Sequence, residues 1–355
     1  MTEPLGRNDR HALILAGGRG ERFWPWSTPE RPKQLLPMGP GGLTLLAATF
    51  QRATRLMPAG NVVVMTAAHL VAACRRECPG AIVVGEPVGR NTAPAIAAAA
   101  AFFPDDAVFT VLPSDHAIEN ENAFVADFER AFTLAAQEPL LVTFGIKPIG
   151  PETSFGYVKR GERVADRVYR VAQFKEKPDR AKAEAWVAEG GYFWNTGMFV
   201  WAKRSFLAAL AAGRPEIAKA LSGLRFAAGQ EKDFEAALAM RFPALESISV
   251  DYAVLEVAPN VVMFDAAFDW DDLGGWLAWS RHQPQDARGN VTWGQAVPVD
   301  CDRCVVVGDG APAAPLGLSD MVVVVTSQGT LVCRVADSEQ VRRVTEAVRA
   351  RGSKS

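Results

Sequence analysis

The chain has 355 residues, 49% of them hydrophobic, and is therefore long enough to bury a sizeable core in one large domain or in a large and a small one. Its 38 basic and 40 acidic residues give a formal net charge of -2, which argues against recruitment of nucleic acid or an anionic membrane by the overall field. Any anion-binding site must therefore be local.

Neither the cysteines nor the apolar segments point to export or to a membrane. The five cysteines are an odd number in a long chain, and Cys301 and Cys304 lack a second pair at metal-ligand spacing, so we interpret all five as structural. The first ten residues are polar, without the apolar segment of a secretory signal, and the apolar stretch 93–103 is too short to span a bilayer. We predict a cytoplasmic protein with no nucleic-acid or membrane partner.

Short β-branched segments alternate with alanine-rich segments of helical periodicity in the first part of the chain. This alternation is typical of βαβ units, and strands that are apolar on both faces suit a sheet covered by helices on both sides. Ligands of such sheets bind at the carboxyl ends of the strands. We predict strands at 12–16, 61–66, 81–85, 107–112 and 139–146, and helices at 44–57, 91–103 and 121–137.

The chain changes character twice after residue 146. From 147 to about 285, strand-like segments are mixed with predicted helices, one of them at 179–189. Beyond 290, short valine-rich strands are separated by Gly, Asp and Pro turns, and an amphipathic helix is predicted at 337–350. We therefore expect an α/β domain over 1–285, with a Rossmann-like, mostly parallel mixed sheet, and a small β-rich domain over 286–355. In the absence of a strict repeat, a left-handed β-helix is one of the folds open to this second domain.

The loop GGRGERFWPWSTPERPKQ, residues 17–34, follows the first predicted strand directly. Its glycines lack a Cβ and so let backbone N–H groups approach a phosphate chain. The loop is not a Rossmann fingerprint, because Phe23 stands where a third glycine is needed, and the chain contains no Walker G-K-[ST] sequence.

The cations of this loop carry its most distinctive signal. Arg22 and Lys33 flank a stiff, proline-rich segment that could return the lysine to the arginine. A reaction of polyphosphates needs fixed positive charge where negative charge shifts, so we predict that both bind phosphates. Arg19 and Arg31 are better explained as solvated arginines.

Two segments elsewhere in the chain carry aspartates that could bind a metal ion. Asp115, in VLPSDH, comes after the predicted strand 107–112, where a carboxylate could hold Mg²⁺ against substrate phosphates. An Asx turn or helix cap explains an isolated aspartate there equally well. WDDLGGW offers Asp271 and Asp272, one of which could complete a site with two aspartates.

Three further segments carry polar residues that suit a nucleoside or a sugar. Asn91 or Thr92, in GRNTAP, could cap the next helix or face a nucleobase. Glu176 and Lys177 end a predicted strand, and Asn195 lies in the apolar run YFWNTGMFVW. A buried amide needs partners, because an unpaired one costs about 1–3 kcal/mol; sugar hydroxyls or other core groups would both serve.

Together these segments resemble the mannose-1-phosphate guanylyltransferases, also called GDP-mannose pyrophosphorylases, of the sugar nucleotidyltransferase superfamily. The resemblance is carried, in order, by LAGGRGERFWPWSTPERPKQLL, GEPVGRNTAPAI, LPSDHAI, FGYVK, FKEKPD, WNTGMFVW, SVDYAVLE and FDWDDLGGW, and it covers nearly the whole chain. It implies transfer of GMP from GTP to mannose 1-phosphate by in-line attack, with release of pyrophosphate. The cupin-like isomerase domain of longer relatives is not expected.

The resemblance also implies roles for individual residues. The triphosphate would be held by Gly17, Gly18, Gly20, Arg22 and Lys33, and Mg²⁺ by Asp115 and Asp272, the second of which matches the aspartate of the family's W-S-D-[IV]-G-S-W. Asn91 and Thr92 would lie near guanine or ribose; Gly156, Glu176 and Asn195 would hold mannose and Lys177 its phosphate. The family resemblance further implies a homodimer.

The chain departs from the family at three points that bear on this interpretation. Arg19 and Glu21 replace a small residue and, often, a threonine, and a carboxylate beside a triphosphate repels it unless it pairs with an arginine or faces away. Asp271 replaces a serine, which leaves open which carboxylate binds metal. The alternatives are a nucleotidyltransferase for another sugar 1-phosphate or nucleotide and, ranked lower, a subunit that senses nucleotide sugars without catalysis.

Overall fold

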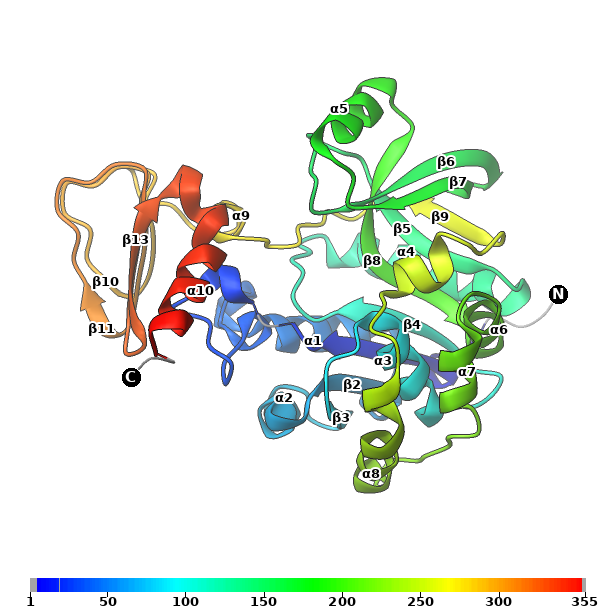
Figure 1. Cartoon of the computed structure of the whole chain (residues 1–355). Coiled ribbons are helices and arrows are strands. Elements are labelled where there is room, and N and C mark those ends of the chain that lie inside the picture. The colour runs from blue at the N-terminus through cyan, green and yellow to red at the C-terminus, as the bar shows by residue number, and fades with distance from the viewer. Residues whose placement is uncertain (1–4, 19, 353–355) are drawn as a thin grey trace. The chain divides into compact units, whose positions relative to one another are not determined.

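The structure, a computed structural model, describes residues 5–18 and 20–352, so Arg19 lies outside the described residues (Figure 1). The chain divides into two compact units. Unit 1 comprises Met1–Gly17, Leu46–Ser114 and Ile118–Trp270, whereas unit 2 comprises Gly18–Leu45, Asp115–Ala117 and Asp271–Ser355. Most of the cationic loop 17–34 and both aspartate segments therefore fold with the β-rich tail.

Unit 1 is built on a mixed sheet, as predicted, but parallel pairing does not predominate among its described strands, because β6, β7 and β8, which come from the part of the chain after residue 146, add antiparallel pairs. Parallel pairing joins β1 to β2, β2 to β3, β1 to β4 and β5 to β9, while β6, β7 and β8 pair antiparallel with their neighbours. Among the described residues the sheet has nine strands in the order β3-β2-β1-β4-β8-β5-β9-β7-β6. Their bounds are β1 Arg10–Ala16, β2 Val62–Ala67, β3 Ile82–Glu86, β4 Val108–Pro113, β5 Leu141–Ile146, β6 Gly156–Ala165, β7 Val168–Glu176, β8 Tyr192–Ala202 and β9 Val261–Asp265.

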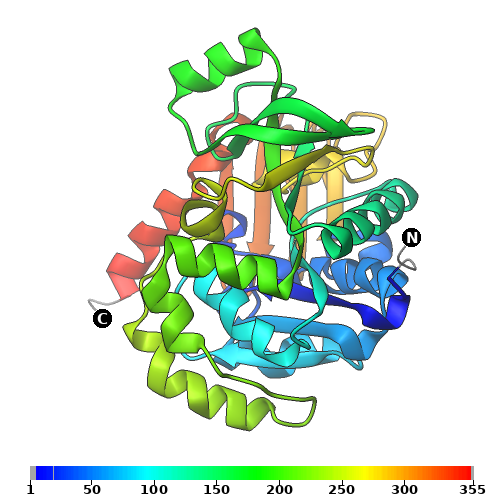
Figure 2. The same cartoon turned by 90° about the vertical axis from the view of Figure 1, so that its right-hand side faces the viewer.

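Helices cover both faces of this sheet (Figures 1 and 2). On one face Phe206 of α6 meets Phe109 of β4 edge to face at 6.1 Å, and on the other Phe128 of α4 stacks on Phe144 of β5 at 4.2 Å. The helices are α1 Leu45–Leu56, α2 Val71–Glu77, α3 Thr92–Ala99, α4 Glu121–Gln137, α5 Arg180–Glu189, α6 Lys203–Gly213, α7 Pro215–Leu221 and α8 Glu231–Arg241.

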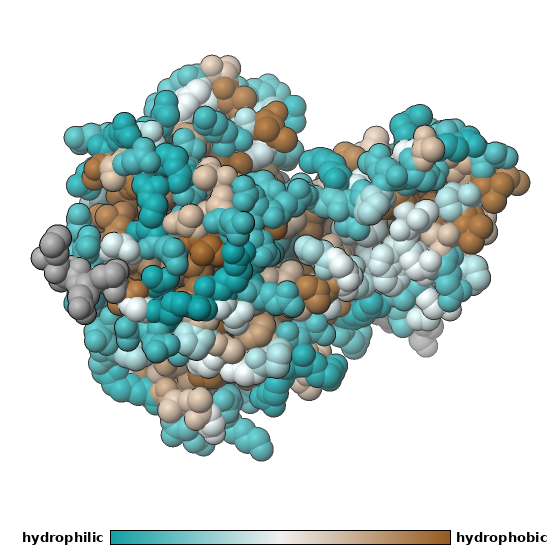
Figure 3. All heavy atoms as spheres, turned by 180° about the vertical axis from the view of Figure 1, so that it is seen from behind, coloured by the Kyte–Doolittle hydropathy of each residue, from teal (hydrophilic) through white to brown (hydrophobic). Residues whose placement is uncertain are grey.

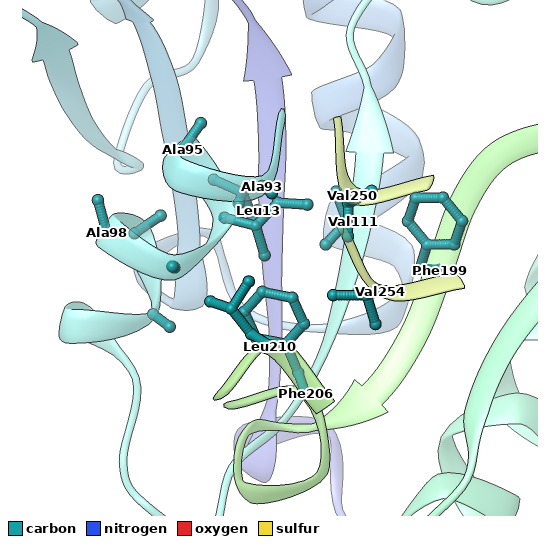
Figure 4. Close-up of a cluster of buried hydrophobic side chains, with 14 of the residues drawn as sticks. Leu13, Ala93, Ala95, Ala98, Val111, Phe199, Phe206, Leu210, Val250 and Val254 are labelled. Carbon is teal, nitrogen blue, oxygen red and sulfur yellow. The ribbon is translucent and has the colours of Figure 1, made fainter. Parts of the chain in front are cut away.

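Alanines let helix α3 approach the sheet closely. Figure 4 shows Ala93 and its neighbours on α3 beside Leu13 of β1, with Val250 and Val254 beside Val111 of β4. Side chains this small leave little distance between backbones, and the close packing rigidifies the carboxyl end of the sheet from which α3 starts. The predicted helix 91–103 ends early, since α3 passes into a tighter 3₁₀ turn over Ala100–Phe102.

Unit 2 contains the β-rich tail, whose described residues form a sheet in the order β10-β11-β12-β13. The first three strands are parallel and β13 is antiparallel to β12, so valines stack through the register Val291, Val305 and Val322. The bounds are β10 Val291–Ala296, β11 Val305–Ala313, β12 Met321–Thr326 and β13 Gly329–Arg334, with helices α9 Trp276–Arg281 and α10 Val341–Gly352. Helix α10, red in Figure 1, follows β13 through a 3₁₀ segment, Val335–Gln340.

The aromatic residues of the loop 17–34 anchor it to this tail. Trp26 is 1% exposed and packs on Trp276 at 6.0 Å and on Trp293 at 4.8 Å. Its Nε1 donates a hydrogen bond to the Oδ2 of Asp309, which also accepts one from Arg31. Trp26 and Arg31 therefore have structural contacts within unit 2.

Charged and polar residues cover most of the face drawn in Figure 3, with apolar residues in scattered patches. Within the described part of the chain, no helix is both long enough and apolar enough to cross a membrane.

Candidate active site

The loop can close on itself because residue 20 is glycine. Gly20 has φ 61, in the left-handed region, and a Cβ there would collide with the backbone nitrogen and Cβ of Lys33. Ser27 Oγ donates a hydrogen bond of 2.6 Å to the carbonyl of Gly20, and Gln34 Nε2 donates one of 3.1 Å to the carbonyl of Gly18. The two ends of the proline-rich segment are thus held side by side.

Lys33 joins three segments that are far apart in sequence. Its side chain is almost completely buried, and its Nζ donates hydrogen bonds to the Oδ2 of Asp115 at 2.9 Å and to the carbonyl of Asp272 at 2.6 Å. An ammonium has three donors, so one remains for a further acceptor. Arg22 Nη1 donates to the carbonyl of Gly274 at 3.1 Å, which brings the guanidinium to the same turn.

These groups line one cavity of about 290 Å³ in unit 2, which we call the cationic cavity. Arg22, Lys33, Asp115 and Asp272, predicted separately from the sequence, all border it. The full lining is Gly20, Glu21, Arg22, Phe23, Lys33, Asp115, His116, Asp272, Leu273, Gly274 and Arg342. The sequence analysis missed Arg342, which reaches the cavity from α10, because nothing in the local pattern connects the final helix to the loop.

The two aspartates of the cavity are in different electrostatic states. Burial opposes ionisation of Asp115, but the Lys33 ammonium and His116 hold its pKa below the ordinary value. Burial raises the pKa of Asp272 to about 6, with Asp271 and Asp115 adding repulsion and Lys33 opposing the rise. Asp272 is therefore a half-buried carboxylate whose charge is incompletely compensated.

Asp271 points to a different set of partners. Its Oδ2 lies 3.1 Å from His282 Nε2 and 3.8 Å from Arg281, and its Oδ1 accepts a hydrogen bond from the backbone of Leu273. Burial opposes ionisation, but the hydrogen bond to His282 lowers the pKa of Asp271. Asp271 does not line the cationic cavity, and the geometry thus separates the two adjacent aspartates.

The donor set of the cavity suits a small divalent cation. Carboxylate oxygens are the ligands that Mg²⁺ prefers, and it commonly takes one or two from protein and the rest from phosphates and water. The described residues contain no group of three or more His, Cys, Asp or Glu side chains arranged for a metal ion, so a pair of aspartates is what the cavity itself offers. A cation there would compensate the buried charge of Asp272.

The residues predicted to hold a sugar phosphate lie together in unit 1. Gly156 of β6 pairs with Glu176 of β7, and a Cβ on the glycine would collide with the Glu176 carboxylate and crowd Asn195. Lys177 Nζ lies 3.1 Å from Glu176 Oε1. Asn195 Oδ1 accepts a hydrogen bond from Thr143 Oγ1 at 2.9 Å. We call Gly156, Glu176, Lys177 and Asn195 the polar cluster.

Asp251 completes the polar cluster and was not assigned from the sequence. Its Oδ1 accepts a hydrogen bond of 3.0 Å from Asn195 Nδ2. Burial, with repulsion from Glu176, raises its pKa to about 7. The signal for it in the sequence is the motif SVDYAVLE, in which Asp251 is followed by a mainly apolar stretch.

Asn91 caps the first turn of α3, and Thr92 links the start of this helix to the segment around Val250. Asn91 has φ 65, and its side chain accepts a hydrogen bond from the Thr92 amide. Thr92 Oγ1 accepts one of 2.8 Å from the amide of Val250, next to Asp251. The capping role proposed as the alternative is therefore present, and Thr92 also ties the cap to the segment that carries Asp251.

Gly17, at the end of β1, adjoins the carboxylate of Glu86, at the end of β3. The predicted residues thus form separate groups: Gly18, Gly20, Arg22, Lys33, Asp115 and Asp272 in unit 2, and Gly17, Asn91, Thr92, Gly156, Glu176, Lys177 and Asn195 in unit 1.

Comparison with known sequences matches two families along the chain. Residues 11–288 match the nucleotidyl transferase family, and residues 294–348 match the MannoseP isomerase/GMP-like beta-helix domain. The chain is 38% identical over 344 residues to a mannose-1-phosphate guanylyltransferase of Escherichia coli, covering 94% of this chain and 73% of that protein. It is 36% identical to the xanthan biosynthesis protein XanB of Xanthomonas campestris pv. campestris, over 96% of this chain and 73% of XanB.

Among solved structures, one described as a mannose-1-phosphate geranyltransferase from Thermus thermophilus superposes with a TM-score of 0.84. Its sequence is 33% identical, and the match covers 96% of this chain and 99% of the other. The likeness includes the mixed sheet and the β-rich tail.

Proposed function

The chain belongs to the mannose-1-phosphate guanylyltransferase family of nucleotidyl transferases, and we propose that it transfers the GMP unit of GTP to α-D-mannose 1-phosphate. The products are GDP-mannose and pyrophosphate. The observation that supports this most directly is the convergence of Arg22, Lys33, Asp115 and Asp272 on one cavity of unit 2.

The reaction is an in-line displacement at the α-phosphorus of GTP. A phosphate oxygen of mannose 1-phosphate forms the new bond, and the bond between the α-phosphorus and the β-phosphate oxygen breaks, so that pyrophosphate leaves with that electron pair. The nucleophile is already an anion and needs no protein base. Catalysis then consists of positioning and charge neutralisation.

We assign the triphosphate to the cationic cavity. The backbone at Gly18 and Gly20 carries no Cβ that would block close approach of phosphates, and, apart from its chain neighbours, no described residue has an atom within 4 Å of a Cβ placed at Gly18. Arg22 and Lys33 neutralise the negative charge that builds up on the leaving pyrophosphate. Lys33 is well suited to this because its two hydrogen bonds fix the ammonium before substrate arrives.

Asp115 and Asp272 would hold Mg²⁺, which when bound withdraws charge from the phosphates and orients them. The protein's own contribution is to keep both carboxylates on one cavity and to restrain Asp115 through Lys33.

We assign mannose 1-phosphate to unit 1. Glu176, Asn195 and Asp251 present acceptors and a donor for sugar hydroxyls, Gly156 leaves room beside them, and the Lys177 ammonium is available to the phosphate. Gly17 is assigned, with Gly18 and Gly20, to the triphosphate, and Asn91 and Thr92, at the start of α3, are assigned to guanine or ribose.

The proposal is tested by mixing purified protein with GTP, mannose 1-phosphate and MgCl₂ and measuring pyrophosphate release. Arg22→Ala should lower kcat/KM by orders of magnitude, since it removes a fixed charge at the leaving group. Arg180→Ala, which removes an exposed arginine paired with Glu184 on α5, is the matched control and should behave as wild type. Wild-type turnover in Arg22→Ala would contradict the assignment.

The same assay with a panel of nucleoside triphosphates and sugar 1-phosphates decides between GTP with mannose 1-phosphate and another substrate pair. Selectivity is expressed as a ratio of kcat/KM values, because discrimination between hexoses depends on a few hydrogen bonds. Binding of GDP-mannose without any turnover would instead support a sensor. The homodimer implied by the family is tested by sedimentation velocity.

A further inference from the structure

Helix α10 contacts the cationic loop through Glu21, one of the positions at which this chain departs from the family pattern. The Glu21 side chain is 17% exposed, and its Oε1 lies 2.8 Å from Arg349 Nη1 while its Oε2 lies 3.6 Å from Arg342 Nε. Thr345 Oγ1, between these arginines on α10, donates a hydrogen bond of 3.4 Å to the Glu21 carbonyl. The carboxylate that would repel a triphosphate is therefore occupied by arginines.

The two arginines differ in one respect that matters for chemistry. Arg342 lines the cationic cavity, whereas Arg349 does not. Arg342 contacts Glu21 and Glu346 through Nε at 3.6 and 3.3 Å, and it donates no hydrogen bond to any residue that the structure describes. A guanidinium has five N–H donors in a planar fork that suits phosphate oxygens. Most of that capacity is left for a ligand of the cavity.

The lining of the cavity needs a third cation if its carboxylates are not to outnumber its positive charges. The described lining has three carboxylates, Glu21, Asp115 and Asp272, against the cations Arg22, Lys33 and Arg342. Without Arg342 the carboxylates would outnumber the cations, and the lining would repel an anionic substrate. Arg22 and Lys33 already donate hydrogen bonds to protein oxygens, so Arg342 is the least committed of the three.

We propose that Arg342 of the C-terminal helix binds the β- and γ-phosphates of the nucleotide and the pyrophosphate that they become. Glu21 acts as the positioning residue of Arg342. One of its carboxylate oxygens orients Arg342, and the other forms an ion pair with Arg349 that holds Glu21 in place. This inference rests on the proposed function, since it names a further residue of that same phosphate site. It makes the β-helix domain a contributor to the site rather than an appendage.

The test compares three variants of neighbouring arginines on α10. Arg342→Gln removes the proposed phosphate contact. Arg349→Gln removes the ion pair that holds Glu21 in place but removes no group that lines the cavity. Arg343→Gln is the matched control, because Arg343 is exposed and donates to Gln340. Each protein is assayed in the direction of pyrophosphorolysis, with GDP-mannose and pyrophosphate as substrates, and its thermal unfolding is recorded.

Arg342→Gln should raise KM for pyrophosphate by roughly 10- to 100-fold, the range typical for loss of a hydrogen bond to a charged group, and leave KM for GDP-mannose within about threefold. Arg342→Lys, which keeps the charge and loses the fork, should fall between this variant and wild type. Arg343→Gln should match wild type. An equal rise in Arg342→Gln and Arg349→Gln, accompanied by equal loss of thermal stability, would overturn the proposal in favour of a purely structural clamp.

A binding experiment tests the inference independently of the proposed function. Pyrophosphate is titrated into the protein in the presence of Mg²⁺, and the heat of binding is measured by calorimetry. If the wild type binds pyrophosphate and Arg342→Gln binds it about tenfold more weakly or worse, the Arg342 site stands even should GTP and mannose 1-phosphate not react. Unchanged pyrophosphate affinity in Arg342→Gln overturns the site, whether or not the wild type is active.

Discussion

Lys33 Nζ lies 2.9 Å from Asp115 Oδ2, although 82 positions separate the two residues in the chain. The pair joins the end of the cationic loop to the turn that follows β4, and the same ammonium donates a hydrogen bond to the backbone of Asp272. One lysine thus connects the loop with both aspartate segments. It restrains one proposed metal ligand by its charge and the other through the main chain.

We expect Lys33→Met to abolish most of the activity. Methionine has a similar length but no charge, so the Asp115 carboxylate loses its cation and the leaving pyrophosphate loses a fixed positive charge. The expected loss in kcat/KM is on the order of 10³-fold, with a decrease of about 1–3 kcal/mol in the free energy of unfolding. Pyrophosphate release and urea denaturation measure the two effects, and Lys182→Met, an exposed lysine on α5, is the control.

The two glycines of the loop should respond differently to alanine. Gly20→Ala places a Cβ at φ 61 against the backbone of Lys33 and should cost about 1–3 kcal/mol of stability as well as activity. In Gly18→Ala the new methyl group lies more than 4 Å from every described residue outside its chain neighbours, so stability should be almost unchanged, while GTP binding should weaken because we assign phosphates to this position. Thermal unfolding and KM for GTP are the measurements. Equal stability of the two variants would contradict the left-handed turn.

Replacement of Asp271 and of Asp272 should have different effects, one on stability and the other on Mg²⁺ dependence. Asp272→Asn removes a carboxylate from the cationic cavity and should raise the Mg²⁺ concentration for half-maximal activity about tenfold or more, without loss of stability, since the buried charge is already unfavourable. Asp271→Asn breaks the ion pair with His282 and should lower stability by about 0.5–2 kcal/mol while Mg²⁺ dependence stays near wild type. The reverse pattern would exchange their roles.

Asp251 should be required for the sugar phosphate and not for the fold. Asp251→Asn keeps an oxygen for the amide of Asn195 and removes a carboxylate that Glu176 repels, so the free energy of unfolding at pH 8 should stay the same or rise. KM for mannose 1-phosphate should increase about tenfold or more while KM for GTP changes little. A selective rise in KM for GTP would place Asp251 with the nucleotide.

The strands of unit 1 and the polar residues after them could be predicted because each follows from local pattern. β-branched runs such as 61–66 and 107–112 are strands in any context that buries both faces, and the carboxyl ends of parallel strands locate their ligands. Arg22 and Lys33 could be paired because the glycines and prolines between them restrict the path of the chain.

Contacts that depend on the tail could not be predicted from local pattern. Nothing in the final helix, a surface-like sequence rich in arginine, indicates that Arg342 and Arg349 meet Glu21 more than three hundred positions away. The burial of Trp26 could not be predicted for the same reason, because Trp276 and Trp293, which are remote in sequence, pack against it. Long-range packing decides such contacts, and one sequence without structure does not reveal it.

The free energy of unfolding should decrease as pH rises because of Glu86, the last residue of β3. Its Oε2 is buried and accepts no hydrogen bond from the described residues, and burial raises its pKa to about 7, although the Arg90 amide opposes the rise. Between the ordinary value near 4.5 and about 7, the unfolded chain is ionised at this position and the folded protein is not, so unfolding releases a proton and becomes easier as pH rises. Below this window Glu86 contributes nothing, and above it the penalty is constant.

Glu86→Gln should remove this pH dependence. A rise in pKa from 4.5 to about 7 corresponds to about 3.4 kcal/mol at most, so the variant should gain part of that amount at pH 8 and almost nothing at pH 4.5. Glu77→Gln, on α2, provides a variant with the same change in charge for comparison. The free energy of unfolding in urea, measured from pH 4.5 to 8, separates the two cases: parallel curves for wild type and Glu86→Gln would show that this carboxylate ionises normally in the folded protein, and that burial at the end of β3 imposes no cost.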